Sequence, residues 1–496
     1  MSDTKSTSSL AASDLEKDQR DAVVEAGSDA EYRQAVRRLD YAILPVTALI
    51  YLLNFLDRSN IGNAKVAGMP NDINLTSHQY LICITVTYVP YIACEIPSNL
   101  ILKKVGPQRL IPTVVMAWGI VSCLTGLVQN FGGLVTARFF LGLCEGSVFP
   151  GLVLYLSMFY RRRELQSRIS IFFASASISG AFSGLLAAAI LNLDGVGGQE
   201  GWRWIFYLEG LFTVLFGATL YWLLPGTPSQ CRFLTNRQKD LIKLRLAADT
   251  PGGLEGVDDD NEISWKEVKA SLTSPHVLLL GISLWGLGFT LYALAYWIPT
   301  IVKTFGYSTV QTQLLTVPPF VSAFLVTMLT AWFSDRYGQR GLCAIAMSAI
   351  ALVGYVMFYK SLLTSVRYTA LFLAVTGVYS AAPALITWMP NNSSRHCRKA
   401  VSVAFGFVST NCAGIASTWL FPAEEAPQYA TASKALIAMT IVMGLFAGLN
   451  VLYLRHANAQ KAIRRRERDE AGEPNEVTIA KWKEEGDRHC DFVYTY

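Results

Sequence analysis

The chain carries a succession of apolar stretches, each about 20 residues long, and this feature constrains its fold more than any other. A bilayer core about 30 Å thick is crossed by about 20 helical residues, each of which advances the helix by about 1.5 Å. Twelve such stretches are present, at residues 41–61, 80–102, 110–128, 134–159, 169–191, 204–224, 277–300, 314–333, 342–359, 368–389, 400–421 and 435–454. The sequence therefore predicts an all-α membrane protein with twelve transmembrane helices.

The composition excludes several classes of protein. Hydrophobic residues make up 52% of the chain and charged residues 16%, and the mean hydropathy is +0.32, whereas about a quarter of the residues in a soluble protein are charged. A disordered scaffold and a typical cytosolic enzyme do not fit. The cysteines form no CxxC pair, so neither a disulfide framework nor a metal site is expected. We find no catalytic motif, cofactor motif or nucleic-acid module, and expect no enzyme activity, cofactor or nucleic-acid partner.

A polar gap divides the spans into two blocks of six. We predict a disordered cytoplasmic tail over residues 1–38, an amino-terminal six-helix bundle over 39–225 and a cytoplasmic linker over 226–275. A second six-helix bundle follows over 276–455, and a cytoplasmic tail over 456–496. The linker combines a charged helix-like segment with the acidic run 258–260.

The distribution of basic residues predicts the orientation in the membrane. Basic clusters occupy alternate loops, at residues 103–109, 161–168, 336–340 and 395–399, whereas the opposite loops carry only scattered cations such as Lys65, Lys303 and Lys360. Because cytoplasmic loops are rich in Lys and Arg, both termini are predicted to be cytoplasmic. A further basic run at 464–466 agrees with this orientation, and we interpret it as a run that is solvated or faces lipid headgroups. We expect the plasma membrane as the location.

Few charges interrupt the apolar spans, and these are costly to bury in lipid. Asp57 and Arg58 lie in the outer third of the first span. Arg138 and Glu145 lie on the fourth span, where Arg138, Gly142 and Glu145 share one helical face. The first three charges fall at a similar depth and Glu145 nearer the midplane, as expected for residues that line a polar cavity between two helices.

Two acids and two arginines can form a switch. Ionised carboxylates neutralise the guanidinium groups, whereas protonated carboxylates leave two positive charges that favour an anion. The hypothesis is a carboxylate-bearing substrate moved together with protons. The alternative is a static ionic network that locks the two helices together. All five histidines lie outside the span centres, so carboxylates must carry the protons. Glu95 and Glu209 lie near span ends and are interpreted as structural.

Three GxxxG steps, Gly142 with Gly146, Gly180 with Gly184 and Gly444 with Gly448, indicate close helix packing. A sliding seam of an alternating-access protein is the second interpretation.

The segment 331–340, AWFSDRYGQR, resembles the GxxxDRxGRR loop signature of the major facilitator superfamily. A degenerate partner at 103–109 occupies the matching loop of the first block, with Lys103 in place of the usual acid. This resemblance implies the major facilitator fold and a gating role for Asp335 and Arg336. A simple basic cluster at the inner face is the alternative.

Four further segments, at 55–64, 95–99, 138–146 and 201–206, are similar to the anion:cation symporter family in its fungal allantoate permease branch. The resemblance implies that Arg58 binds a substrate carboxylate, that Arg138 pairs with Glu145, and that Asp57 and Glu145 take up protons. It also matches Tyr91 to a tyrosine that contacts substrate.

The leading hypothesis is a monomeric, proton-coupled importer of a small organic anion such as a vitamin, ureide or sugar acid. The partners expected are this anion, protons and membrane lipid. Export of a fungal metabolite is the alternative; it is weakened because residues 181–189 lack the proline of the fifth-helix antiporter signature. A nutrient sensor without transport activity would usually need a longer cytosolic extension.

Overall fold

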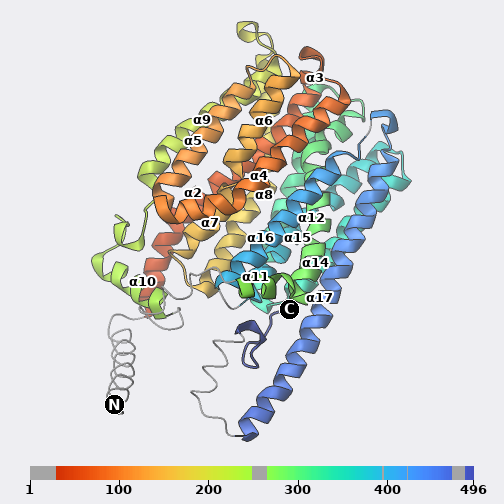
Figure 1. Ribbon diagram of the computed structural model, residues 1–496. Coiled ribbons are helices and arrows are strands. Elements are labelled where there is room, and N and C mark those ends of the chain that lie inside the picture. The colour runs from red at the N-terminus through yellow and green to blue at the C-terminus, as the bar shows by residue number, and fades with distance from the viewer. Residues whose placement is uncertain (1–28, 249–264, 394–395, 422, 472–485) are drawn as a thin grey trace.

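The computed structural model describes residues 29–248, 265–393, 396–421, 423–471 and 486–496. Within these ranges every long element is a helix (Figure 1), and the predicted all-α class is confirmed. The expected tail up to residue 28 and the acidic run 258–260 lie outside the described residues. Residues 29–38, assigned from sequence to the tail, form the first turns of a helix.

The helices fall into two halves and a linker. The amino-terminal half contains α2 (Asp29–Val66), the short α3 (Met69–Asp72), α4 (Ser77–Val105), α5 (Pro107–Thr125), α6 (Phe131–Glu145), α7 (Val148–Ser157), α8 (Arg162–Ile190) and α9 (Gly201–Leu223). The linker carries α10 (Asn236–Ala248) and α11 (Trp265–Leu272). The carboxy-terminal half contains α12 (Pro275–Lys303), α13 (Thr309–Tyr337), α14 (Arg340–Lys360), α15 (Thr364–Asn391), α16 (His396–Thr418) and α17 (Ala430–Ala471).

Ten helices among the described residues are long and apolar enough to cross a membrane. The fourth predicted span is divided into α6 and α7 at Gly146 and Ser147. Pro150 explains the break, because it has no N–H to donate to the carbonyl four residues earlier. The second predicted span is α4, a helix of 29 residues. Together with α4 and the α6–α7 pair, these ten helices form twelve membrane crossings.

Local sequence signals set the helix ends. Thr76 and Ser308 each begin a helix with a capping box, in which the hydroxyl accepts from the backbone N–H three residues later. Gly338 ends α13 in the left-handed region, at φ 66°, where glycine carries no steric penalty.

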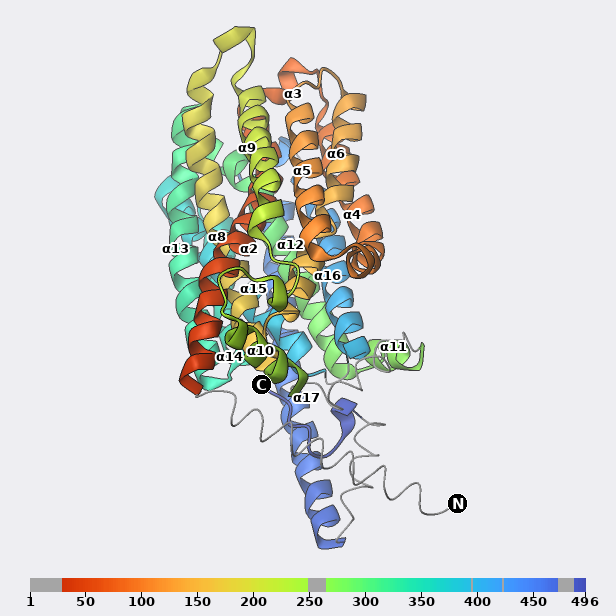
Figure 2. The same cartoon turned by 90° about the vertical axis from the view of Figure 1, so that its left-hand side faces the viewer.

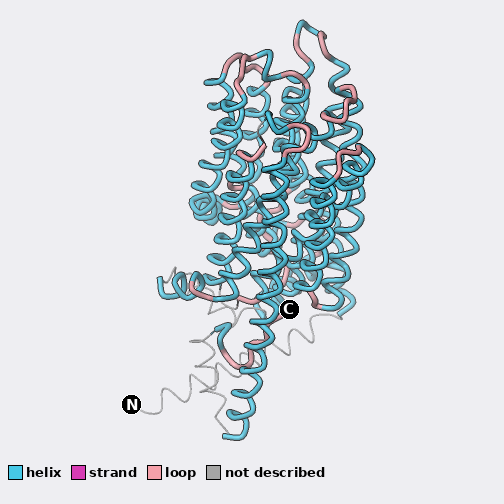
Figure 3. The backbone as a smooth tube through the Cα atoms, turned by 90° about the vertical axis from the view of Figure 1, so that its right-hand side faces the viewer, coloured by secondary structure: helices cyan, strands magenta, loops and turns pink. Residues whose placement is uncertain are grey.

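The beginning of α2, the linker helices and Tyr496 lie at one end of the bundle, which we call the inner end; α3 lies at the opposite, outer end (Figures 1 and 2). The halves meet where α2 packs on α12 and α8 on α13. Figure 3 shows that the helices run lengthwise between these ends and that α17 continues beyond the inner end.

Of the three GxxxG steps, the one on α8 lies between the halves. A Cβ added to Gly180 would come within 2.5 Å of the Phe320 ring, and one added to Gly184 within 2.8 Å of the Gln313 carbonyl oxygen. Both neighbours belong to α13. The missing side chains therefore permit the close approach of α8 and α13.

Candidate functional site

The two halves meet around the guanidinium of Arg58, which α2 places near the middle of the bundle. Its Nε lies 3.1 Å from Oε2 of Glu145 on α6, and the two side chains are 6% and 0% exposed. The Tyr91 ring of α4 lies below the guanidinium, 4.6 Å from ring centroid to Cζ. Three of the residues singled out from sequence thus form one buried cluster, which we call the central cluster.

Tyrosines of α12 connect this cluster to the carboxy-terminal half. Arg58 Nη1 donates to the Tyr292 hydroxyl at 2.8 Å, and that hydroxyl donates to Oδ1 of Asn411 on α16 at 2.9 Å. Tyr88 of α4 donates to the Tyr296 hydroxyl at 3.0 Å. The charge of Arg58 is therefore shared between a carboxylate of its own half and a hydroxyl of the other.

A glycine permits Glu145 to reach Arg58. A Cβ on Gly146 would lie 2.5 Å from the Tyr91 carbonyl oxygen, so only glycine lets α6 approach α4 this closely. The carboxylate has one oxygen on Arg58, while its Oε1 has no hydrogen-bond partner in the described part of the chain.

Asp57 belongs to a different network, inside the amino-terminal half. It accepts hydrogen bonds from Ser122 Oγ at 2.9 Å, from Asn60 Nδ2 at 3.3 Å and from Trp118 Nε1. Asn60 also donates to Glu209. Of the two neighbours, Arg58 faces the other half and Asp57 faces its own, because adjacent residues of a helix point about 100° apart.

Arg138 is buried at 3% exposure, but it does not pair with Glu145. Its guanidinium lies over the Phe206 ring, at 5.7 Å, and within electrostatic reach of both Asp57 and Glu145. The pairing implied by family resemblance is corrected: Glu145 binds Arg58, which reaches it from α2. Nε and Nη2 of Arg138 lack partners in the described chain, so this charge retains unused donors.

Aromatic residues close the outer end above the central cluster. The Lys65 ammonium lies 4.0 Å from the Trp297 ring centroid of α12 and 4.6 Å from that of Tyr80 on α4. Nearby, the Trp419 indole donates to Thr85 Oγ1 at 3.0 Å. Since Trp297 and Trp419 belong to the opposite half, these contacts hold the halves together on the outer side.

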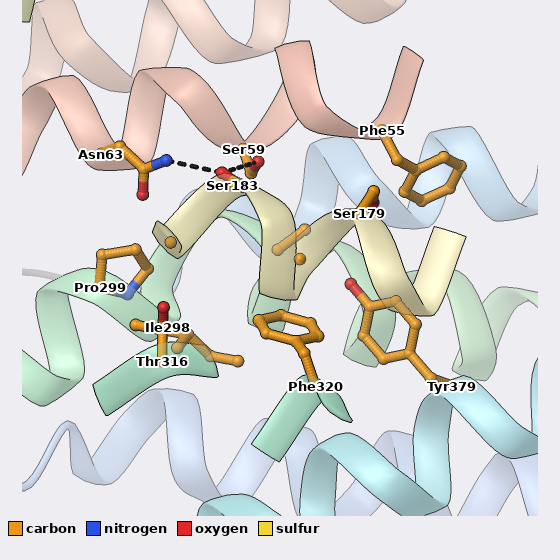
Figure 4. Close-up of a pocket in the computed structure, with 13 residues that line it drawn as sticks. Phe55, Ser59, Asn63, Ser179, Ser183, Ile298, Pro299, Thr316, Phe320 and Tyr379 are labelled. Atoms are coloured by element: carbon orange, nitrogen blue, oxygen red, sulfur yellow. Dashed lines mark hydrogen bonds between the residues drawn. The ribbon is translucent and has the colours of Figure 1, made fainter. Parts of the chain in front are cut away.

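A small cavity lies on the next face of α2, between α8, α12, α13 and α15 (Figure 4). Its polar side is a chain of groups in which Ser59 Oγ donates to Ser183 Oγ at 2.6 Å and Asn63 Nδ2 donates to the same oxygen at 2.7 Å. Phe320 and Tyr379 form its apolar side (Figure 4). Arg58 does not line this cavity. The cavity therefore lies beside the central cluster and does not contain its charged groups.

The expected gate residues lie in the last turn of α13, at the inner end. Arg336 is exposed, and the Asp335 side chain lies outside the described residues. Arg340 of the same motif is buried and donates to the Thr387 carbonyl oxygen at 3.0 Å. Their gating role stays a prediction.

Asn60 and Asn411 were missed by sequence reasoning. Both are polar side chains inside apolar spans, at 0% and 1% exposure, and that pattern was the available signal. Tyr292 and Tyr296 were noted only as aromatic residues within a span. Nothing local in the sequence shows that they face Arg58, some 230 residues away.

Comparisons with known proteins agree with this architecture. A sequence model described as "Major Facilitator Superfamily" matches residues 47–418. An uncharacterized transporter of Schizosaccharomyces pombe is 36% identical over 86% of this chain and 84% of its own length. The MFS-type transporter efuF of Hormonema carpetanum is 30% identical over 87% and 85%.

Solved structures show the same fold. A bacterial homologue of the human lysosomal transporter Spinster, in an inward-facing conformation, has a TM-score of 0.64 at 16% identity, over 86% of this chain and 97% of that one. The proton:xylose symporter XylE has a TM-score of 0.62 at 16% identity, over 84% and 95%.

Proposed function

The chain belongs to the major facilitator superfamily, and its relatives are named transporters. We propose that it is a secondary transporter that moves a small organic anion together with protons. The observation that carries this proposal is the buried pair of Arg58 and Glu145 at the junction of the halves. An arginine paired with a single carboxylate binds an external anion only when that carboxylate is neutralised or displaced.

The exchange of partners supplies the coupling. When Glu145 takes up a proton, it loses its charge and Arg58 is left with hydrogen bonds alone; a substrate carboxylate then restores the charge balance as a bidentate partner. When the substrate leaves, Glu145 releases its proton and returns to Arg58. Arg138, with donors unused in this arrangement, is proposed as the second attraction for the anion, and Asp57 as a second proton acceptor.

Closure of the halves completes the cycle. Tyr292 joins Arg58 to the opposite half, so a substrate that occupies Arg58 competes directly with a contact between halves. Tyr91 is proposed to stack against the bound molecule. The inner motif around Asp335 and Arg336 is proposed to gate the other side. We further propose a monomer in the plasma membrane.

An uptake assay tests the proposal. Cells without the endogenous transporters are given labelled nicotinate, allantoate or gluconate, which represent a vitamin, a ureide and a sugar acid. Uptake of one of these should disappear in Arg58→Ala while the protein still reaches the membrane. Glu145→Gln should retain exchange of labelled for unlabelled substrate but lose its dependence on a proton gradient. Normal uptake in both variants would rule out the scheme, and gradient-driven loss of preloaded substrate would indicate export.

A further inference from the structure

The last described segment, residues 486–496, lies against the inner end of the carboxy-terminal half. It appears in Figure 1 as the dark blue stretch beside α17. The segment is not helical beyond residue 488; apart from a few bonds within it, such as that from the Phe492 N–H to the His489 carbonyl oxygen, its backbone N–H and C=O groups find their partners outside the segment. Most of these partners are side chains of the transmembrane helices.

Two asparagines, one on α17 and one directly after α15, hold consecutive residues of the segment. Asn458 of α17 accepts from the Tyr494 N–H and donates to the Tyr494 carbonyl oxygen, both at 2.9 Å. Asn392, which follows α15, accepts from the Thr495 N–H at 2.9 Å and donates to its carbonyl oxygen at 3.0 Å. Each amide thus pairs with both polar groups of one residue, as a neighbouring β-strand would.

Further contacts fix the register. The Lys461 ammonium lies 3.5 Å from the Tyr494 ring centroid, the Trp388 indole donates to the Thr495 carbonyl oxygen at 2.8 Å, and the Arg340 N–H at the start of α14 donates to the Tyr496 carbonyl oxygen at 2.7 Å. Trp388 is fully buried. The site therefore binds the backbone of the segment through side-chain hydrogen bonds and the Tyr494 ring through a cation–π contact with Lys461.

Charge pairs anchor the segment at two more places. Asp487 lies 2.5 Å from Arg398 Nη1, and the same guanidinium also binds Glu267 of the linker helix α11. Asp491 lies 3.0 Å from Arg465 and also binds Arg468. Hydrogen bonding from Arg468 lowers the pKa of Asp491. Arg398 thus joins the segment to the linker between the halves.

We propose that the inner end of the carboxy-terminal half is a docking site for an extended segment, and that residues 486–496 occupy it as a strap. The strap ties α14, α15 and α17 together and, through Arg398, fixes α11. Because α11 belongs to the linker that joins the two halves, a docked strap that holds α11 through Arg398 limits how far the halves can separate on the inner side. Release of the strap is then a means to regulate alternating access.

Hydrogen–deuterium exchange of the full chain in lipid nanodiscs tests the strap. We expect the amides of residues 494 and 495 to be protected in the native chain. The double variant Asn392→Ala, Asn458→Ala should exchange these amides about tenfold faster or more, with faster exchange also in α11 and the first turn of α14. Gln460→Ala is the matched control, because Gln460 lies on the exposed face of α17 and bonds to His456.

Removal of residues 486–496 provides a second, independent variant. It should raise exchange in the same two regions, and the free peptide 486–496 added to the truncated chain should reverse the rise. A peptide with Asp487→Asn and Tyr494→Ala should not reverse it. Unprotected amides at 494 and 495 in the native chain would overturn the docking. Protected amides, together with unchanged exchange of α11 and α14 after release, would overturn the role as a strap. Slow exchange in the middle of α12 in every variant shows that the fold is intact.

Discussion

Replacing Glu145 by glutamine tests the coupling most directly, since it removes a charge and keeps the shape of the side chain. In the native chain the carboxylate lies 3.1 Å from Arg58 with both groups out of water. Losing one partner of such a buried pair leaves an uncompensated charge, at a cost of about 3–5 kcal/mol. Because about 1.4 kcal/mol is a tenfold change in an equilibrium constant, an anion that restores the balance gains a large advantage in the variant.

The pH dependence of substrate binding shows whether Glu145 is the proton carrier. If binding requires proton uptake by this carboxyl, raising the pH weakens binding, and the limiting slope for one proton is about a tenfold rise in Kd per pH unit. Glu145→Gln cannot take up the proton, so its Kd should be tight and constant between about pH 5 and 8. The measurement is equilibrium binding, to protein in nanodiscs, of the labelled carboxylate found in the uptake assay.

Two controls make the outcome decisive. Glu209→Gln alters another buried carboxylate of the same half, which bonds Asn60 and not Arg58, and it should keep the native dependence of Kd on pH. Asp57→Asn examines the second proposed proton acceptor. If Kd in Glu145→Gln depends on pH as in the native chain, the reasoning is refuted. If only Asp57→Asn loses this pH dependence, Asp57 and not Glu145 is the proton carrier.

Three other changes probe the contact between the halves. Tyr292→Phe removes a hydrogen bond to the charged Arg58, worth about 1.5–3 kcal/mol, and should increase outer-side opening measured by distances between spin labels on α3 and α13. Lys65→Met keeps the apolar stem but removes the cation–π contact with Trp297, worth about 0.5–2 kcal/mol; it should shift the same distances in the same direction, and Lys65→Arg should restore them. Gly184→Leu places a side chain into the backbone of α13 and should abolish uptake, with surface expression as the check; native uptake in this variant would show that the seam tolerates separation.

The central cluster was only partly accessible from sequence. Arg58, Glu145 and Tyr91 were identified because charges and a matching tyrosine are informative in apolar spans, and the structure brings these three together. The ion-pair partner implied for Glu145 was wrong, because Glu145 binds Arg58 and not Arg138. Shared depth in the membrane cannot specify which way a side chain points around its helix, and Arg58 and Arg138 occupy similar depths.

The sequence by itself determined the class of fold, the number of membrane crossings and the candidates for buried charge. Hydrophobic length and helical rise are local quantities, so a single chain segment suffices to predict them. Tertiary structure decided what no segment contains: that Asp57 turns into its own half while Arg58 meets Tyr292 of the other, and that the segment 486–496 returns to Asn392 and Asn458. These contacts depend on helix rotation and on the packing of elements far apart in the chain, which apolar periodicity leaves open.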